Sequence, residues 1–389
     1  MNIFKSKDID GNNRVSGIFS SGKCPPVDIT FTVLTVILAV FGSIMVFSAG
    51  MPYAEFRYGD AFFFIKRQII WVFLGFGVMA IASRIRPEIY YKITPIAYTV
   101  TLLLLILVLA IGLVGNGAQR WISIGPLTIQ PSEIAKMTIV MMLAYYFSRY
   151  GERALDNKKT FIYGTLIPCM IMGVPILLVM LQKHLSCIII LGIIGLFVII
   201  ASGINTKYIS GFSAVGGIGV TCLALFTDYT KDRITVWQNP EQYKLTGGWQ
   251  TLQGLMAIGS GGAFGLGYGK SILKYCYVSE PANDMIFAIL CEELGFVGAF
   301  ITLLLFALLV IRGYKLSLSV SGVFERLVIF GVCTKIAVQT LLNVAVVTNT
   351  IPNTGISLPF FSYGGSSLIM LFFEIGMVLS FSRNAKIIK

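Results

Sequence analysis

Ten long apolar runs are the feature that most constrains what this chain can fold into. A helix needs about 20 mostly apolar residues to cross a bilayer, and the runs approach or exceed that length. They fall at residues 30–50, 69–83, 93–114, 133–148, 162–181, 185–203, 207–226, 285–311, 325–348 and 362–382. The sequence therefore predicts an all-α integral membrane protein of about ten transmembrane helices. The longest polar segment, 227–284, is expected to form an extracytoplasmic loop between the seventh and eighth helices.

The composition excludes a soluble globular enzyme. Of the 389 residues, 56% are hydrophobic and only 12% are charged, whereas soluble domains are about 25% charged. A soluble fold of this size would leave large apolar patches facing water.

The positive net charge has two explanations. The chain carries 30 Lys and Arg against 18 Asp and Glu, a net charge of +12. Such an excess suits either nucleic-acid binding or basic loops on the cytoplasmic side of a membrane. Ten spans place both ends on one side, and the basic residues concentrate there once the long loop is set aside. We therefore expect no nucleic-acid partner, and two cytoplasmic tails, 1–29 and 383–389, flanking a membrane domain at 30–382.

Cysteine and histidine give no sign of a metal site. The chain has 7 Cys and 1 His. No two Cys follow a metal-binding spacing, and most lie within apolar runs, which favours simple packing. A single histidine, His184, excludes a His-based metal centre.

Six ionisable residues lie within the apolar runs. Charges at membrane depth are costly, so each is a functional candidate. They are Glu133, Lys136, Glu292, Glu293, Lys335 and Glu374. A structural role is the alternative, because buried charges are generally paired. The first two are three residues apart on one helix and could neutralise each other. We expect the adjacent glutamates to pair with Lys335, which leaves Glu374 in need of another basic partner or a proton.

The segment 116–136 combines a basic residue, an aromatic residue and a predicted helix start. Pro131 fits the first position of a helix, and Glu133 suits its positive end. Arg120, Trp121 and the helix N-terminus are therefore expected to gather at the outer interface, where they could bind phosphate. An interfacial Trp beside a snorkelling Arg explains the same residues equally well.

Asp284 is the single residue that points most directly to chemistry. It ends the long loop and begins the eighth apolar run. Partial desolvation at this boundary would raise the pKa of its carboxyl toward values useful for a general base. Capping of the following helix is the structural alternative. Within the same loop, Thr246 to Ile258 could form a short amphipathic helix at the interface.

Two glycine-rich stretches allow different interpretations. The run Gly-Leu-Gly-Tyr-Gly-Lys-Ser at 265–271 resembles a phosphate loop, but a Walker A motif requires glycine where Phe264 stands. The run Pro-Phe-Phe-Ser-Tyr-Gly-Gly-Ser-Ser at 359–367 opens the last span. Its small residues permit close helix packing or leave room for a lipid or sugar. We therefore count Ser366 among the candidate substrate-binding residues.

Taken together, these stretches resemble the SEDS family (shape, elongation, division and sporulation), which includes FtsW, RodA and SpoVE. The matching segments occur in family order, and the ten-span pattern extends the likeness over nearly the whole chain. The matching segments are 116–136, 257–262, 265–271, 284–295 and 339–367. The glycine-rich stretches are more similar to the FtsW and SpoVE branch than to RodA.

The resemblance implies a peptidoglycan glycosyltransferase that polymerises lipid II, an undecaprenyl-pyrophosphoryl disaccharide-pentapeptide. It implies a multi-pass protein of the bacterial cytoplasmic membrane that works with a class B penicillin-binding protein, the transpeptidase, among membrane lipids and other divisome or elongasome proteins. The family's essential Asp falls on Asp284. Its basic pair falls on Arg120 and Lys136, with Trp121 and Glu133 in the same motif. A divalent cation, Mg²⁺ or Mn²⁺, is a further candidate at this site.

The chain departs from the family pattern in two places. Where members often read Gln-Pro-Asp-Leu-Gly-Thr, residues 182–187 read Gln-Lys-His-Leu-Ser-Cys, so any role of that Asp cannot be carried over. Before Asp284, the common His-Thr is replaced by Ala282 and Asn283. The hydrogen-bonding neighbours of Asp284, and with them its pKa, are therefore expected to differ.

Two other functional classes compete with a polymerase. A flippase or transporter of the lipid-linked precursor would depend most on the charges at membrane depth and would need access from both faces. A non-catalytic division scaffold would tolerate the loss of Asp284 and Arg120. A polymerase would depend most on Asp284, and the motif match favours this interpretation.

Overall fold

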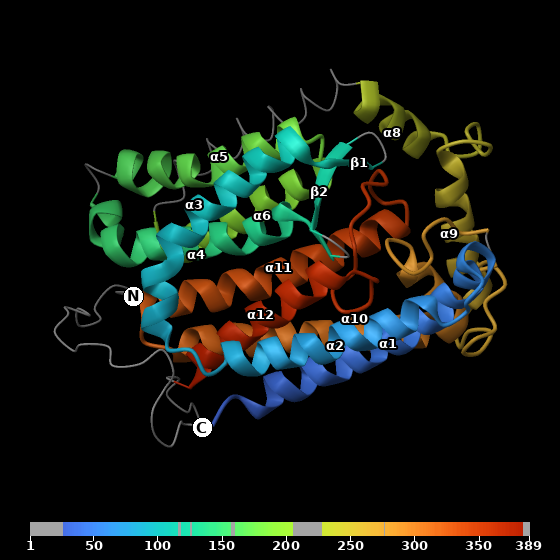
Figure 1. Cartoon of the computed structure of the whole chain (residues 1–389), viewed down its shortest axis with the longest axis horizontal. Helices are drawn as coiled ribbons and strands as arrows, with labels where there is room; N and C mark the ends of the chain where they lie inside the picture. Colours follow the sequence, from blue (N-terminus) through green and yellow to red (C-terminus); the bar gives the residue numbers. More distant parts are fainter. Residues whose placement is uncertain are drawn as a thin grey trace.

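The computed structural model describes residues 26–115, 118–124, 127–156, 160–204, 228–275 and 277–383, and this part of the chain is mostly helical (Figure 1). Nine of the ten predicted runs coincide with helices; the seventh, 207–226, lies outside the described residues. The helices are α1 (Ile29–Tyr58), α2 (Phe63–Ala82), α3 (Pro87–Ile111), α4 (Pro131–Leu155), η1 (Thr160–Leu166) continuing into α5 (Ile167–Leu181), α6 (Leu185–Ala201), α10 (Ile286–Ser319), α11 (Val323–Val347) and α12 (Gly365–Ser382).

Local sequence explains where several helices begin and end. The carboxylate of Asp28 caps α1 by accepting a hydrogen bond from the backbone N–H of Phe31. Proline occupies the first position of α3 and α4, where its missing N–H costs nothing. Among the described residues, seven helices are long and apolar enough to cross a membrane, counting η1 with α5, and α6 is a shorter apolar helix. The chain is thus a multi-pass membrane protein.

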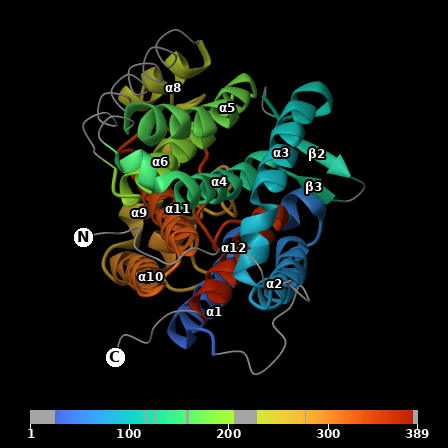
Figure 2. The ribbon, with the colours of Figure 1, turned by 90° about the vertical axis from the view of Figure 1, so that its left-hand side faces the viewer.

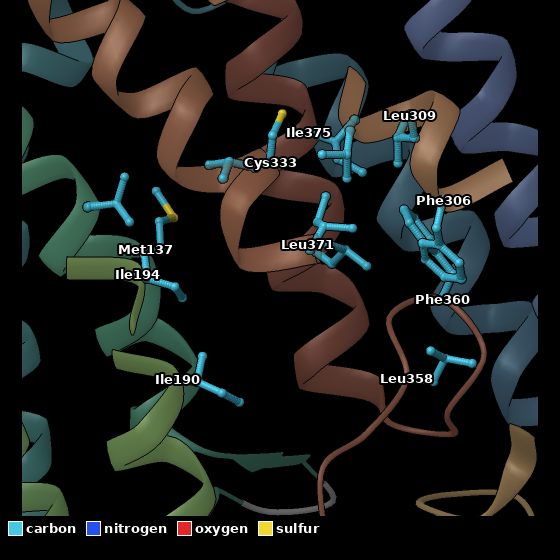
Figure 3. Packing of buried hydrophobic residues seen from close by; sticks show 14 of the residues in the cluster. Met137, Ile190, Ile194, Phe306, Leu309, Cys333, Leu358, Phe360, Leu371 and Ile375 are labelled. Carbon is cyan, nitrogen blue, oxygen red and sulfur yellow. The ribbon is translucent and has the colours of Figure 1, made fainter. Parts of the chain in front are cut away.

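The hydrophobic core lies between the central helices of the bundle, which the remaining helices surround. Figure 2 shows α4, α11 and α12 at the centre, with α1, α2, α3, α5 and α10 around them. In the most apolar stretch of α11, 72% of the residues are buried, against 22% for α2 and for α3. Apolar side chains of α4, α6, α10, α11 and α12 fill the interior, among them Phe306 and Leu371 (Figure 3). The outer helices present apolar residues outward, as a lipid environment allows.

The segment between α3 and α4, for which the sequence predicted no strands, forms a small antiparallel sheet. Its strands are β1 (Leu113–Gly115), β2 (Ala118–Ile124) and β3 (Leu127–Ile129), with β2 in the middle. Ser123 pairs with Thr128 across the second hairpin. The sheet fixes Arg120 and Trp121 on its central strand.

The long loop contains two shorter helices, α8 (Asp228–Gln238) and α9 (Gly248–Gly261). The second confirms the helix expected near Thr246 to Ile258, and it packs against α10. The helix α10 bends at Gly295, whose φ of +66° is a left-handed conformation that favours glycine. The backbone of Ala263 and Gly265 approaches α10 closely there. The loop is therefore an integral part of the fold.

The start of α1 and the end of α12 lie at the same end of the bundle. The backbone N–H of Asp28 donates to the hydroxyl of Ser382 at 3.4 Å. Arg312, near the end of α10, donates from Nε to the Asp28 carboxylate at 3.1 Å. This placement agrees with an even number of membrane crossings between the two ends.

Candidate functional site

Asp284 lies in the turn that precedes α10 and is partly buried. Its backbone carbonyl accepts a hydrogen bond from the side-chain amide of Asn343 on α11, at 3.0 Å. The N-cap residue of α10 is Met285, and no side chain makes a capping hydrogen bond there. Helix capping therefore does not explain Asp284, and its carboxylate remains available for another role.

Three charged side chains act on the Asp284 carboxylate. Burial raises the pKa of Asp284 to about 6, and the negative charge of Glu280 contributes in the same direction. Arg233 of α8 and Arg120 of β2 oppose this rise. A carboxyl with such a pKa is deprotonated at neutral pH yet basic enough to accept a proton. The direction of this pKa rise agrees with the effect expected from partial desolvation at this position.

A short stretch of backbone, the 353–356 segment, covers the Asp284 carboxylate. Gly355 has a φ of +69°, and a Cβ at this position would lie 3.0 Å from Oδ2 of Asp284. Three side chains bind the segment's carbonyls: Arg233 donates to Asn353, Ser186 to Thr354, and Asn343 to Ile356. The segment is thus held from three elements at a distance from the carboxylate that leaves little room for a Cβ at Gly355.

Arg120 approaches the site from the sheet. Its guanidinium donates from Nη2 to the carbonyl of Lys183, in the turn between α5 and α6, at 2.8 Å. Its Nε is buried without a hydrogen-bond partner. Trp121, the next residue of β2, is partly buried. The sheet thus holds Arg120 where its charge acts on the Asp284 carboxylate.

His184 stands where the family pattern has Asp. The side chain is buried, and its Nδ1 lies 3.4 Å from the hydroxyl of Ser132. Burial, followed by the positive charges of Arg120 and Lys136, lowers the pKa of His184 to about 3. The imidazole is therefore neutral at physiological pH, and this position no longer supplies a negative charge.

Two buried ion pairs are formed by side chains of the long helices. Lys136 contacts Glu133 at 2.6 Å, which confirms the neutralisation expected from their spacing. Lys335 of α11 contacts Glu374 of α12 at 2.7 Å. A narrow pocket between α4, α11 and the entry to α12 is lined by Glu133, Lys335, Gln339, Ser357, Leu358, Pro359, Phe360, Ser362, Ser367, Leu368 and Leu371. Ser366 is partly buried beside Ser367 but does not line this pocket.

One face of α11 joins this pocket to the turn that holds Asp284. Lys335, Gln339 and Asn343 are spaced four residues apart and share that face. Gln339 donates to the carbonyl of Ser357 at 3.0 Å. The same face of α11 thus contacts both the pocket and the turn that holds Asp284.

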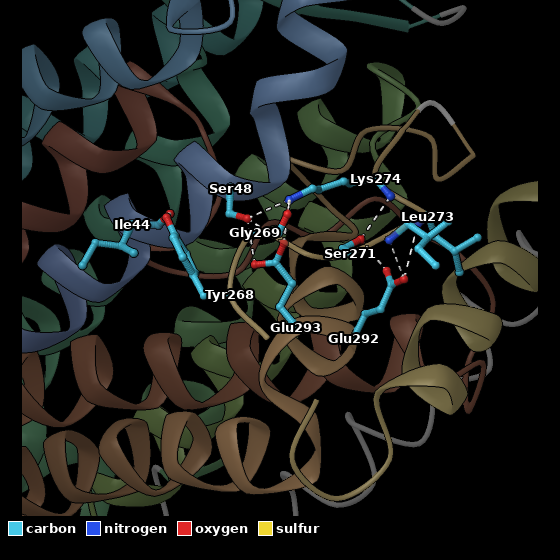
Figure 4. A network of polar contacts seen from close by, with 10 residues as sticks. Ile44, Ser48, Tyr268, Gly269, Ser271, Leu273, Lys274, Glu292 and Glu293 are labelled. Carbon is cyan, nitrogen blue, oxygen red and sulfur yellow. Dashed lines mark hydrogen bonds and ion pairs between the residues drawn. The ribbon is translucent and has the colours of Figure 1, made fainter. Parts of the chain in front are cut away.

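The expected pairing of Glu292 and Glu293 with Lys335 is wrong. Glu293 contacts Lys274 at 2.8 Å and accepts a hydrogen bond from Ser48 of α1 (Figure 4). Glu292 accepts from the hydroxyl of Ser271 and from the backbone N–H groups of Ile272 and Leu273. The serine of the Gly-Lys-Ser run and the residues that follow it therefore bind the protein's own buried carboxylates. The prediction failed because it treated the long loop as separate from the helices.

Sequence reasoning also missed Arg233, Asn343 and Gly355. The position of Asn343 eight residues after Lys335 could have placed it on the same face of α11. Arg233 lies in a loop without a pattern that marks its partner. Among the described residues, no group of three or more His, Cys, Asp or Glu side chains could hold a metal ion.

The fold and site define a multi-pass helical membrane protein with a half-buried carboxylate and two arginines beside the ends of its helices. The chain belongs to the family of cell cycle proteins formed by FtsW, RodA and SpoVE, whose sequence profile matches residues 29–387. The family predicted from the sequence motifs is therefore confirmed.

Several relatives and solved structures are similar to this chain over most of their length. Stage V sporulation protein E of Bacillus subtilis is 35% identical over 364 residues, which span 92% of this chain and 98% of that protein. The probable peptidoglycan glycosyltransferase FtsW of Geobacter sulfurreducens is 34% identical over 92% of this chain and 96% of that protein. A chain of a peptidoglycan synthase complex that coordinates polymerization and crosslinking superposes with a TM-score of 0.77 at 25% identity, covering 92% and 98%. The rod shape determining protein RodA of Thermus thermophilus superposes with a TM-score of 0.69 at 25% identity, over 92% of this chain and 97% of that chain.

Proposed function

We propose that this chain is a peptidoglycan glycosyltransferase that polymerises lipid II at the outer face of the bacterial cytoplasmic membrane. The observation that carries the proposal is the half-buried Asp284, whose pKa is raised to about 6 beside two arginines. The names of the relatives, probable peptidoglycan glycosyltransferases among them, support the same reaction.

The reaction needs a base and an anion site. A sugar hydroxyl oxygen attacks the anomeric carbon of the second lipid-linked sugar, and its proton passes to the Asp284 carboxylate. The bond from that carbon to the pyrophosphate oxygen breaks, and the lipid pyrophosphate leaves with the electron pair. Positive charge stabilises this leaving group without a second acid. One well-placed carboxylate is therefore sufficient.

Arg120 is the residue of the predicted basic pair that we assign to the pyrophosphate. The charge of Lys136 is already balanced by Glu133 at 2.6 Å, so we assign these two to the inner wall of the headgroup site. Trp121 would lie at its rim, and Ser366 beside the pocket at the start of α12. If Mg²⁺ or Mn²⁺ binds, Asp284 and Glu280 are the carboxylates this chain offers, and substrate phosphates would complete the shell.

We further propose the orientation and the partner. Both termini would be cytoplasmic, so that Asp284 and the long loop face outward, as the distribution of basic residues predicts. A class B penicillin-binding protein would cross-link the glycan that this chain makes. The similarity to a chain of a peptidoglycan synthase complex supports such a partner. Membrane lipids and other divisome or elongasome proteins complete the expected surroundings.

A flippase is not favoured. The four charges on which precursor transport would depend are engaged in two closed ion pairs, Glu133 with Lys136 and Lys335 with Glu374. A scaffold without activity gives no reason for a carboxyl with a raised pKa under a glycine-containing segment.

The test is to supply lipid II to the protein co-purified with its class B partner, whose transpeptidase is blocked. We expect glycan polymer from this complex, and no transfer of fluorescent lipid II between leaflets when the same complex is placed in liposomes. Leaflet transfer without polymer, while a control polymerase works in parallel, would replace this proposal with the flippase.

A further inference from the structure

A pyrophosphate leaving group needs more positive charge than the predicted basic pair provides. Of the lysines near the helices, Lys136, Lys335 and Lys274 each contact a carboxylate within 3 Å. Arg120 takes part in no ion pair with a carboxylate in the described part of the chain. A single guanidinium would have to balance two phosphates. The question is which other cation faces Asp284.

Arg233, on α8 of the long loop, is the other cation whose charge acts on the Asp284 carboxylate. It donates to the carbonyl of Asn353, two residues before Gly355, where a Cβ would lie 3.0 Å from Oδ2 of Asp284. Trp237, one turn further along α8, donates from Nε1 to the carbonyl of Asn349 at 2.9 Å. Two side chains of α8 thus attach this helix to the loop that follows α11. Their attachment holds Arg233 on the segment that approaches the Asp284 carboxylate.

Arg120 and Arg233 approach Asp284 from different elements. Arg120 is held by the carbonyl of Lys183, and Ser186 of the adjoining helix binds Thr354 in the segment that Arg233 also binds. Both guanidinium groups are anchored through backbone carbonyls. A guanidinium has five N–H donors in a planar fork, so one can hold a carbonyl while others face a phosphate.

We propose that Arg233 is a substrate-binding residue that, with Arg120, holds the leaving pyrophosphate beside Asp284. This inference rests on the proposed function and adds the second cation of its anion site. Two arginines that reach the surroundings of one carboxylate from different elements suit a diphosphate better than a monophosphate. The site should therefore prefer undecaprenyl pyrophosphate to undecaprenyl phosphate.

The experiment measures binding of these two lipids, radiolabelled, to the full-length protein in nanodiscs. Arg233→Gln is the key variant, because glutamine keeps an N–H donor for the Asn353 carbonyl and removes only the charge. We expect it to weaken pyrophosphate binding about ten- to hundredfold, the usual worth of a charge-assisted phosphate contact. Arg233→Lys should lose less affinity for the pyrophosphate lipid, because it keeps the positive charge. Lys231→Ala, an exposed position on the same helix, should bind as wild type does.

A second readout separates a charge from a structural role. The charged groups facing Asp284 are Glu280 from its own turn, Arg120 from β2 and Arg233 from α8, while α11 contributes the uncharged Asn343. Removing the positive charge of Arg233 should move the acid limb of the pH–rate profile to higher pH. A purely structural role would lower the rate without moving that limb.

Pyrophosphate binding by Arg233→Gln equal to wild type would overturn the inference, as would equal affinity of wild type for the two lipids. Because binding requires no turnover, either result is distinct from failure of the proposed function. That failure would appear as a wild-type complex that binds the lipid but makes no glycan.

Discussion

The side-chain amide of Asn343 on α11 donates to the backbone carbonyl of Asp284 at 3.0 Å and to that of Ile356 at 2.6 Å. One buried residue thus holds both the turn that carries the proposed base and the segment that covers it. Because the contact is to the backbone, the Asp284 carboxylate is positioned without being neutralised. This relationship explains how a charged group can be fixed at the boundary of the helices and still be reactive.

The first prediction concerns pH. Since Asp284 must be deprotonated to act as a base and its pKa is raised to about 6, polymerisation should fall as the pH drops through about 6. The negative charge of Glu280 helps to raise this pKa. Glu280→Gln should therefore lower the pKa and move the acid limb to lower pH. Rates measured from pH 5 to 8 in detergent test both statements, and an unchanged limb in the variant would contradict them.

Gly355→Ala tests the close approach to Asp284. A methyl group there would lie 3.0 Å from Oδ2, and the φ of +69° costs about 1–2 kcal/mol for any residue with a Cβ. We expect polymerisation to fall about tenfold, the rate effect of some 1.4 kcal/mol, while the complex stays folded. Gly259→Ala, on α9 in open space, is the matched control and should keep full activity. Equal rates for the two variants would show that the segment does not position the carboxylate.

The Lys335–Glu374 pair leads to a prediction about stability. Both side chains are almost fully buried, so Lys335→Met leaves an unpaired carboxylate and should cost about 3–5 kcal/mol. Replacing both partners, as Lys335→Met with Glu374→Leu, should cost much less, because no charge is then left unpaired. Thermal unfolding in detergent compares them. A double variant no more stable than the single one would exclude a mutual neutralising role.

Ser48→Ala tests the link between α1 and the long loop. The Ser48 hydroxyl donates to Glu293 at 2.6 Å, and Lys274 donates to Ser48 at 3.1 Å. Its loss should lower the unfolding free energy by about 1–3 kcal/mol, as for other buried hydrogen bonds to charged groups. Ser43→Ala is the control, because that hydroxyl bonds only within its own helix, to Ala39. Similar unfolding temperatures for the two variants would argue against the network.

The sequence predicted the helices well because apolar length is a local property. Nine expected runs coincide with helices, since a span must be apolar along its whole length whatever it contacts. The sheet at 113–129 was missed because its strands are short and gain stability only from hairpin pairing. The i,i+3 contact of Glu133 with Lys136 was likewise predictable, because it is set within one helix.

The parts of the site that were missed depend on contacts distant in sequence. Whether Glu293 pairs with Lys335 or with Lys274 is decided by where the long loop packs, and no residue near Glu293 specifies this. Arg233 is held near Asp284 by a hydrogen bond to a backbone carbonyl of the segment after α11. A backbone carbonyl leaves no trace in the sequence, so this contact could be found only in the structure.

The most direct test of the central claim is lipid II polymerisation by Asp284→Asn. Asparagine keeps the size and the backbone contact to Asn343 but cannot accept the proton. In the complex with the class B partner, transpeptidase blocked, we predict glycan from wild type and at least about a hundredfold less from the variant, as loss of a general base requires. Polymerisation by a folded Asp284→Asn complex at the wild-type rate would contradict the account.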